Sequence, residues 1–356
     1  MKSNYRYIVK AFMAMAVIAG TTSCDDFLDR EPMSSISPET YYSTAAQLEA
    51  NLNDEYPNVL PSFGQWTYGI FGEDKGTDNQ IEVNANDRYT QDRWKVPHSE
   101  SDNWKFERIY RINFFLSEAL PKFGEDMSGS QNTISGSVAT IKHYIGEMYF
   151  LRAYEYFKKL QLFGDFPIIN QPLADEMEAL REASKRFPRN EVARFIISDL
   201  DKAYAYMSDV DMATTRINKD AAMLVKSRVA LFEATWLQNF KGTAFVPGGE
   251  GWPGASLHNN YQYPSGNIDN EVKYFLEQAV EASKLVADKY KGSLTENTGV
   301  LQQSADDPSN PYFDMFAQED LSDVKEVLLW RQYARGLSTH NINAAAGRGN
   351  YRIGLT

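Results

Sequence analysis

The residue best placed for covalent chemistry is the single cysteine of the sequence, Cys24. It follows an apolar run, residues 11–20, which is preceded by Lys2, Arg6 and Lys10. A basic start, a short apolar run and small residues are typical of a secretory signal, and the run is about half of the ~20 residues that a membrane-spanning helix needs. A thiol at this place can accept a diacylglycerol, and the amine freed by cleavage can accept a further chain. We therefore expect a signal peptide at residues 1–23 and lipidation of Cys24.

The next segment, residues 24–43, carries acidic residues and prolines and is predicted to be a tether. The whole chain has a net charge of −12, so anionic lipid headgroups would repel it. Several acyl chains hold a protein stably at a membrane, whereas one holds it only marginally. The lipid is therefore the expected anchor. The alternative is a plain secretory signal followed by an incidental cysteine, and Thr21 stands where lipoprotein signals usually carry leucine.

The sequence contains no recognisable enzymatic constellation. The four histidines are scattered, and no His-Glu-x-x-His pair, Gly-x-Ser-x-Gly elbow or phosphate-binding glycine loop occurs. His143 and Glu147 lie one helical turn apart, which favours a pair on a helix face over a metal site. One cysteine excludes a disulfide scaffold and a cysteine-based zinc site, and the absence of a basic cluster argues against nucleic acid as a partner. We expect no catalytic residues, no cofactor and no metal.

Helices are the elements that must position any site. Apolar residues recur at helical spacing in residues 44–56, 104–120, 137–163, 190–208, 219–239 and 269–290. Strand signals are few and short, such as residues 166–169. Amphipathic helices of this kind must stack on one another, and Gly146, Ala153 and Ala234 are small residues suited to helix contacts. The sequence predicts an all-α-dominated fold over residues 44–356, a tetratricopeptide-like stack of helix pairs with degenerate repeats.

Two long loops, residues 61–101 and 240–268, separate these helices. Loops beyond about 15 residues are uncommon in compact domains unless they bind something or are disordered. Both loops mix aromatic rings, which can stack on sugar rings, with polar groups that can reach hydroxyls. The alternative is that the rings pack beneath the loops as a small core. The predicted ligand-binding residues are Trp66, Asp78, Asn79, Arg88, Tyr89 and Trp94 of the first loop and Trp252 and Tyr263 of the second.

The segment HYIGEMYFLRAYEYFKKLQLFGDFPII, residues 143–169, resembles the signature of SusD-like (RagB/SusD) nutrient-binding lipoproteins of the outer membrane. Four other segments are similar in the same order: SCDDFLDREP at the lipidated start, and residues 104–113, 189–207 and 218–236. The matching signature residues are Glu147, Phe150, Leu151, Arg152, Ala153, Tyr156, Phe157, Phe163, Gly164, Asp165 and Pro167. The resemblance covers nearly all of residues 24–335.

The resemblance implies an α-helical protein with four tetratricopeptide-like helix pairs and an irregular ligand-binding remainder. It implies a lipid-anchored position on the outside of the outer membrane, where acidic residues such as Asp25 and Asp26 mark surface export. There such proteins cover a SusC-like TonB-dependent transporter and pass it oligosaccharides, or peptides in some members. The family is usually longer, so the C-terminal part of its fold is expected to be missing after Thr356.

Glu147 and Arg152 lie in a largely apolar helix, and buried charges require partners. Five residues place them about 140° apart around the helix, so we expect a structural role with separate partners. Residues 163–167 are expected to stop the helix and turn the chain. The predicted function is oligosaccharide binding without a catalytic step. A peptide-binding member of the family, a helical surface glycosidase and a non-binding scaffold are the alternatives.

Overall fold

The computed structural model describes residues 41–61, 80–82, 103–124, 126–208, 212–301, 304, 306–333 and 353–355. The predicted signal peptide, Cys24 and residues 24–40 of the predicted tether lie outside these ranges. So do the candidate ligand-binding residues of the first loop, which are Trp66, Asp78, Asn79, Arg88, Tyr89 and Trp94. Their predicted roles stay predictions.

The described part of the chain is predominantly helical, which confirms the predicted fold class. The helices are α3 (Ala45–Val59), α4 (Glu107–Phe123), α5 (Val138–Phe163), α6 (Met177–Ala183), α7 (Arg189–Tyr206), α8 (Lys219–Asn239), α9 (Ile268–Tyr290) and α10 (Pro311–Ala317). All the long helices agree with their predicted ranges to within a few residues, whereas the short α6 and α10 were not predicted. None of the described helices is both long and apolar enough to cross a lipid bilayer.

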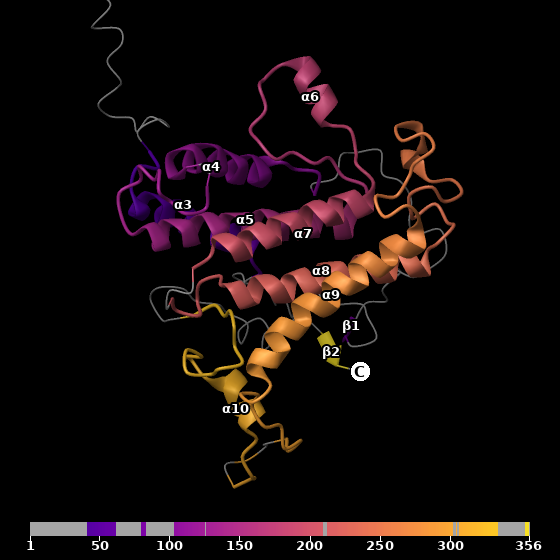
Figure 1. Ribbon diagram of the computed structural model, residues 1–356. Coiled ribbons are helices and arrows are strands. Elements are labelled where there is room, and N and C mark those ends of the chain that lie inside the picture. Colours follow the sequence, from indigo (N-terminus) through magenta and orange to yellow (C-terminus); the bar gives the residue numbers. More distant parts are fainter. Residues whose placement is uncertain are drawn as a thin grey trace, which may run out of the picture.

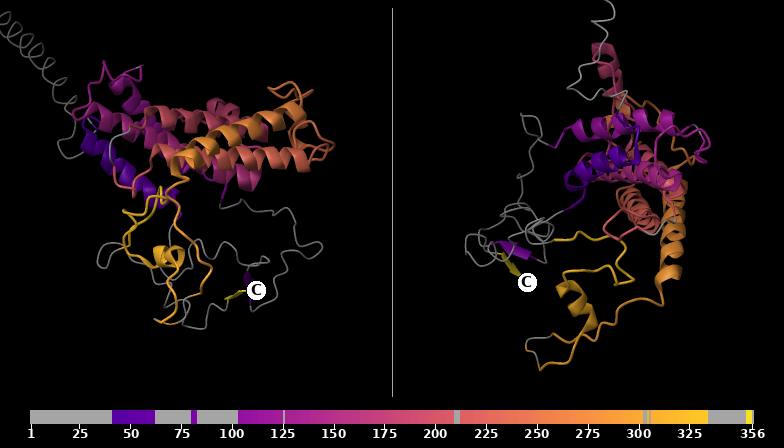
Figure 2. Two further views of the ribbon diagram at one scale, coloured as in Figure 1. Left: turned by 60° about the horizontal axis from the view of Figure 1, so that its bottom comes forward. Right: turned by 90° about the vertical axis from the view of Figure 1, so that its left-hand side faces the viewer.

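The long helices lie side by side and alternate in direction from α4 to α9, as a tetratricopeptide-like stack requires (Figure 1). Helix α5 contacts α3, α4 and α7; α7 also contacts α8, and α8 contacts α9. The views in Figure 2 show the segment after α9, with α10, leaving this stack on one side. Helix α5 is therefore the central element, and most of its residues are buried.

Local sequence explains where several helices begin. Thr44 and Gln47 form a capping box at the start of α3, and the side chains of Ser137, Asn218 and Asn267 accept backbone N–H groups at the starts of α5, α8 and α9. These caps satisfy donors that the first helical turn leaves unpaired. Boundaries set by capping residues are the ones that sequence alone can locate.

A glycine sets the contact between α5 and the end of α7. A Cβ atom on Gly146 would lie only 2.8 Å from the backbone nitrogen of Met207 and 2.9 Å from the carbonyl oxygen of Ala203. Ala153 and Ala234, the other small residues predicted at helix contacts, are fully buried. The small residues therefore allow close helix approach, as the sequence predicts.

Strand structure among the described residues is confined to short pieces. Strand β1 (Gln80–Glu82) pairs antiparallel with β2 (Ile353–Leu355), so the last described residues lie beside the first long loop. Residues 166–169 do not form a strand; Phe166 makes only an isolated bridge with Phe187. The fold is thus held by helix packing rather than by a sheet.

Arginines join neighbouring elements of the stack by pairing with carboxylates that have no exposed surface. The pairs are Arg111–Glu55 (α4–α3), Arg152–Asp199 (α5–α7), Arg189–Glu233 (α7–α8), Arg194–Glu271 (α7–α9) and Arg216–Glu147 (the segment before α8 and α5). Glu147 and Arg152 serve separate partners, as their spacing on α5 predicts. Each carboxylate is neutralised where it is buried, which is the condition for keeping a charge inside a protein.

The Arg152 pair provides a test of this packing. Arg152 donates to both carboxylate oxygens of Asp199, at 2.6 and 2.8 Å, and to Asn113 Oδ1. We expect Arg152→Ala to lower the free energy of unfolding by about 3–5 kcal/mol, because Asp199 loses its bidentate partner and keeps only the half-exposed ammonium of Lys202 at 3.8 Å. Urea denaturation followed by circular dichroism measures this. Arg181→Ala on α6, where the salt bridge to Glu178 is exposed, is the matched control and should leave the midpoint unchanged; equal effects of the two changes would refute the structural role.

The Glu271 pair predicts how stability depends on pH. Burial raises the pKa of Glu271, but hydrogen bonds from Arg194, Asn190 and Ser265 outweigh it, so the pKa lies below the usual 4.5. A lowered folded-state pKa contributes stability above the unfolded-state pKa, and this is lost as the pH falls through the folded value. Glu271→Gln should therefore destabilise the protein at neutral pH. The difference in stability between wild type and variant should become smaller below about pH 4.5. Melting temperatures from pH 3 to 7 test this, and Glu277→Gln, an exposed change on the same helix, should show no such pH-dependent difference.

Candidate functional site

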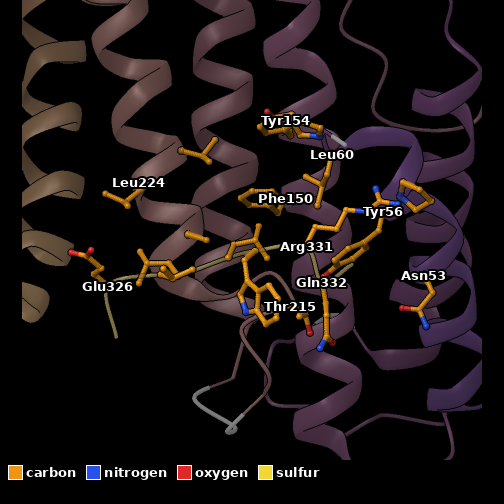
Figure 3. Close-up of a pocket in the computed structure, with 18 residues that line it drawn as sticks. Asn53, Tyr56, Leu60, Phe150, Tyr154, Thr215, Leu224, Glu326, Arg331 and Gln332 are labelled. Carbon is orange, nitrogen blue, oxygen red and sulfur yellow. The ribbon is translucent and has the colours of Figure 1, made fainter. Parts of the chain in front are cut away.

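A pocket of ≈ 850 Å³ lies between the helix stack and residues 326–332, which follow α10 (Figure 3). This volume is within the range of about 300–1,000 Å³ that is usual for small-molecule sites. The lining residues are Asn53, Tyr56, Pro57, Leu60, Pro61, Phe150, Tyr154, Thr215, Ala221, Leu224, Val225, Glu326, Val327, Leu328, Leu329, Trp330, Arg331 and Gln332. The pocket thus joins α3, α5 and α8 to a segment that is distant from all of them in sequence.

Aromatic and apolar side chains from the helices form one side of the pocket. Phe150 and Tyr154 are one turn apart on α5, so they share a helix face, and their rings stack with centroids 6.1 Å apart. Tyr56 comes from the last turns of α3 and Leu224 from the first turns of α8. Because this wall is built on packed helices, its rings are held in place before any ligand arrives.

The other side of the pocket is an irregular segment that polar contacts fix to the stack. The carbonyl of Leu328 accepts a hydrogen bond from Asn218 Nδ2 at 2.6 Å. Trp330 donates through its backbone nitrogen to the carbonyl of Thr214 at 3.1 Å and through its indole nitrogen to Thr214 Oγ1 at 2.8 Å. With both of its donors bound, Trp330 can offer a ligand only its ring face.

A buried network holds Tyr56 in the wall. Its hydroxyl donates to Glu147 Oε2 at 2.9 Å and accepts from the backbone nitrogen of Ile217 at 2.9 Å. Arg216 binds both oxygens of Glu147, at 2.9 and 2.7 Å. Burial, followed by the charge of Glu147, raises the pKa of Tyr56 well above its usual value, so the hydroxyl stays protonated. The signature glutamate therefore supports the pocket from behind.

His143 belongs to the same network and not to a metal site. Its Nε2 atom lies 3.1 Å from Glu147 Oε1 and 3.0 Å from the carbonyl oxygen of Ile217. Both neighbours are acceptors, so Nε2 carries a proton and is not available as a ligand. The predicted helix-face pair is confirmed, and no cluster of potential metal ligands occurs among the residues that the structure describes.

Polar groups lie around the aromatic wall. Asn53, Arg331 and Gln332 are exposed at the pocket, and Thr215 and Glu326 are half-buried. They supply amide, guanidinium, hydroxyl and carboxylate groups beside the rings (Figure 3). Such a site can stack on a flat apolar ligand face and hydrogen-bond its edge.

The structure places the described candidate residues of the second loop away from this pocket. Trp252 is 5 % exposed, and its indole nitrogen donates to Asp165 Oδ2 at 2.7 Å. Tyr263 is half-buried and donates to the carbonyl of Pro247 at 2.7 Å. Both rings pack within a small aromatic core that includes His258 and Tyr261. This is the alternative that the sequence left open, and a ligand role for either residue stays a prediction.

The rings that line the pocket were not among the predicted ligand-binding residues. Phe150 and Tyr154 are part of the helical apolar pattern, which assigns them to packing. Trp330 lies in LLWRQY, residues 328–333, where an aromatic residue beside arginine and glutamine outside any predicted helix was the available signal.

A protein-family profile described as "Starch-binding associating with outer membrane", SusD-like, matches residues 26–231, more than half of the chain. The chain belongs to the SusD-like family. Two curated SusD-like proteins of Formosa agariphila are each 25 % identical to it, one over 233 residues (60 % of this chain and 41 % of the relative) and one over 253 residues (68 % and 46 %). The chain therefore spans less than half the length of these relatives.

Solved structures of SusD-like proteins are similar to parts of the chain. A SusD-like protein from Bacteroides fragilis is 22 % identical with a TM-score of 0.42, covering 60 % of this chain and 39 % of that one. A structure described as a laminarin-binding SusD-like protein is 16 % identical with a TM-score of 0.42, covering 72 % and 45 %.

Proposed function

We propose that this SusD-like protein binds oligosaccharides at the pocket between the helix stack and residues 326–332 and delivers them to a TonB-dependent transporter. The observation that carries the proposal is the composition of the pocket: a wall of fixed aromatic rings with amide and guanidinium groups at its edge. The apolar face of a pyranose can stack on the rings while its equatorial hydroxyls meet the polar groups. The family description, which names starch binding, supports the same ligand class.

Binding without a catalytic step is part of this proposal. Hydrolysis of a glycosidic bond normally requires two carboxyl groups on opposite sides of the scissile bond. Among its described lining residues the pocket carries one acid, Glu326, and this side chain accepts a hydrogen bond from the backbone nitrogen of Thr295. The arrangement supports capture and release.

The anchor and the cellular position are further parts of the proposal. The family is associated with the outer membrane, and the sequence supplies a signal at residues 1–23, a lipid-accepting Cys24 and a tether up to residue 43. We propose that the lipid holds the helical domain, residues 44–356, on the outer face of that membrane. A SusC-like transporter would then be the partner that receives the ligand.

The first long loop is proposed to extend the site. Asp78 and Asn79 directly precede β1, and Trp66, Arg88, Tyr89 and Trp94 complete the set that the sequence suggests. Their rings and polar groups match the chemistry of the described pocket. Single alanine changes in this set would show which of them contribute to affinity.

Isothermal titration against panels of neutral oligosaccharides and short peptides tests the function. We expect at least one oligosaccharide to bind, and Trp330→Ala to weaken it by roughly tenfold, which corresponds to about 1.4 kcal/mol of stacking and burial. Gln332→Ala, an exposed change at the pocket edge, should weaken it several-fold without altering the melting temperature.

Tyr110→Ala is the control for this experiment, because Tyr110 is an exposed aromatic residue on α4 outside the pocket. It should leave affinity unchanged. Binding of peptides alone would favour the peptide-binding alternative, release of reducing sugar would favour the glycosidase, and affinity insensitive to both pocket changes would place the site elsewhere.

A further inference from the structure

A second pocket, of ≈ 580 Å³, lies where the end of α5, the start of α7 and the end of α8 meet the loop before α9. This loop is the orange segment at the right-hand end of the stack in Figure 1. The lining residues are Gln161, Leu162, Phe163, Gly164, Asp165, Arg186, Arg189, Trp236, Ala244, Phe245, Trp252, Pro253 and Gly254. The second pocket lies about ten residues, or ~15 Å, further along α5 than Phe150 and Tyr154 of the first pocket. The two pockets share no lining residue.

The carboxylates at this second pocket are already bound by the protein. Asp165 accepts from the backbone nitrogen of Arg189 at 2.9 Å and from Trp252 Nε1 at 2.7 Å. Burial raises the pKa of Asp165, although the indole and backbone donors oppose this shift. Glu233, behind Arg189, accepts from Arg189 Nε at 3.0 Å and from Nη2 at 2.9 Å. Few acceptors are therefore left to face a ligand.

Arg189 keeps one donor on the pocket side. The residue is 4 % exposed, and its Nε and Nη2 atoms are occupied by Glu233. Nη1 makes no hydrogen bond to any residue that the structure describes, and a Cβ atom on Gly164 would lie 3.4 Å from it. Gly164 has a φ of 68°, so the turn that ends α5 favours glycine and leaves the approach to Nη1 open.

Two further groups on the lining complement this donor. Arg186 is exposed, and the contact of its guanidinium with the Trp104 ring, 4.5 Å from the centroid, orients the side chain. Gln161 adds an exposed amide. Phe245 is 61 % exposed and lines the pocket, so its ring can be reached by a ligand. The lining thus combines two guanidinium groups with an open aromatic face.

We infer that this second pocket binds a carboxylate-bearing sugar, a uronic acid residue of an acidic oligosaccharide. The carboxylate would meet Arg189 Nη1 and Arg186, and the pyranose face would meet Phe245. Arginine suits this task because its planar donors match the two oxygens of a carboxylate. The position at the start of α7 adds the partial positive charge of a helix N-terminus.

The net charge of the chain opposes the binding of an anion, so an acidic sugar needs more from the lining of the pocket than a neutral sugar does. At −12 the protein repels anions at long range, so an acidic sugar requires local cations. At this pocket two arginines, Arg186 and Arg189, stand against one lining carboxylate, Asp165, whose oxygens accept protein donors. A neutral sugar would instead use donors and acceptors alike, and the lining carboxylate here already accepts two protein donors. The second pocket supplies the donor-rich lining that an acidic sugar needs.

Titration of the full chain with trigalacturonic acid and with its fully methyl-esterified form tests the inference. The acid should bind at least tenfold more tightly than the ester, because the ester keeps the ring and removes the charge. The affinity for the acid should also fall as NaCl is raised from 50 to 500 mM, because salt screens the attraction between carboxylate and guanidinium. Arg186→Gln should weaken the acid by five- to tenfold, and Phe245→Ala should weaken acid and ester alike. Both side chains are exposed, so the fold should be retained.

The matched control is Arg331→Gln, which removes an exposed arginine from the first pocket. It should leave the affinity for trigalacturonic acid unchanged, while Arg186→Gln leaves the binding of neutral oligosaccharides unchanged. The inference is overturned by equal affinity for acid and ester, by absence of binding at millimolar acid, or by loss of acid binding in Arg331→Gln. If neutral sugars failed to bind while trigalacturonic acid bound, the proposed function of the first pocket would be refuted and the inference about the second pocket would remain.

Discussion

The structure depends on pairing the charges that α5 carries into the core. Helix α5 is buried on nearly every side, yet it contains Glu147 and Arg152. An unpaired ion there would cost several kcal/mol, so each needs an opposite charge from a neighbouring element. Asp199 on α7 forms a salt bridge with Arg152, and Arg216, just before α8, forms one with Glu147. The two pairs fix the rotation of α5 against its neighbours, because each carboxylate accepts two hydrogen bonds from a planar guanidinium.

The same pairing connects the core to the first pocket. Glu147 receives Arg216 and the hydroxyl of Tyr56, and the backbone of Ile217 closes the network on Tyr56. The chain therefore passes from Thr215 at the pocket through a fixed turn into α8, whose cap Asn218 also holds the carbonyl of Leu328. Pocket geometry and helix packing thus share hydrogen bonds. Glu147, deep in α5, thus helps to hold the wall of the pocket without lining it.

The helices could be predicted because each one carries its own information in apolar spacing and capping residues. The separate partners of Glu147 and Arg152 could also be predicted, since they follow from rotation around one helix. The first pocket could not be predicted, because Tyr56, Phe150 and Trp330 are brought together only by tertiary contacts. Trp252 illustrates another difficulty: its ring packs in the small core of its loop and also lines the second pocket, and the sequence alone cannot separate packing from binding.

The two pockets differ in how the protein uses its arginines. In the core, all three guanidinium nitrogens of Arg152 donate to protein acceptors, namely Asp199, Asn113 Oδ1 and the carbonyl of Asn170, which leaves no donor for a ligand. Arg189 is intermediate, because Glu233 takes Nε and Nη2 while Gly164 keeps Nη1 accessible. The turn after α5 therefore does more than stop a helix. Because the φ of 68° at Gly164 favours glycine, the turn leaves space beside Arg189 Nη1, and in the proposed second site this nitrogen is the donor that meets the anion while Nε and Nη2 stay with Glu233.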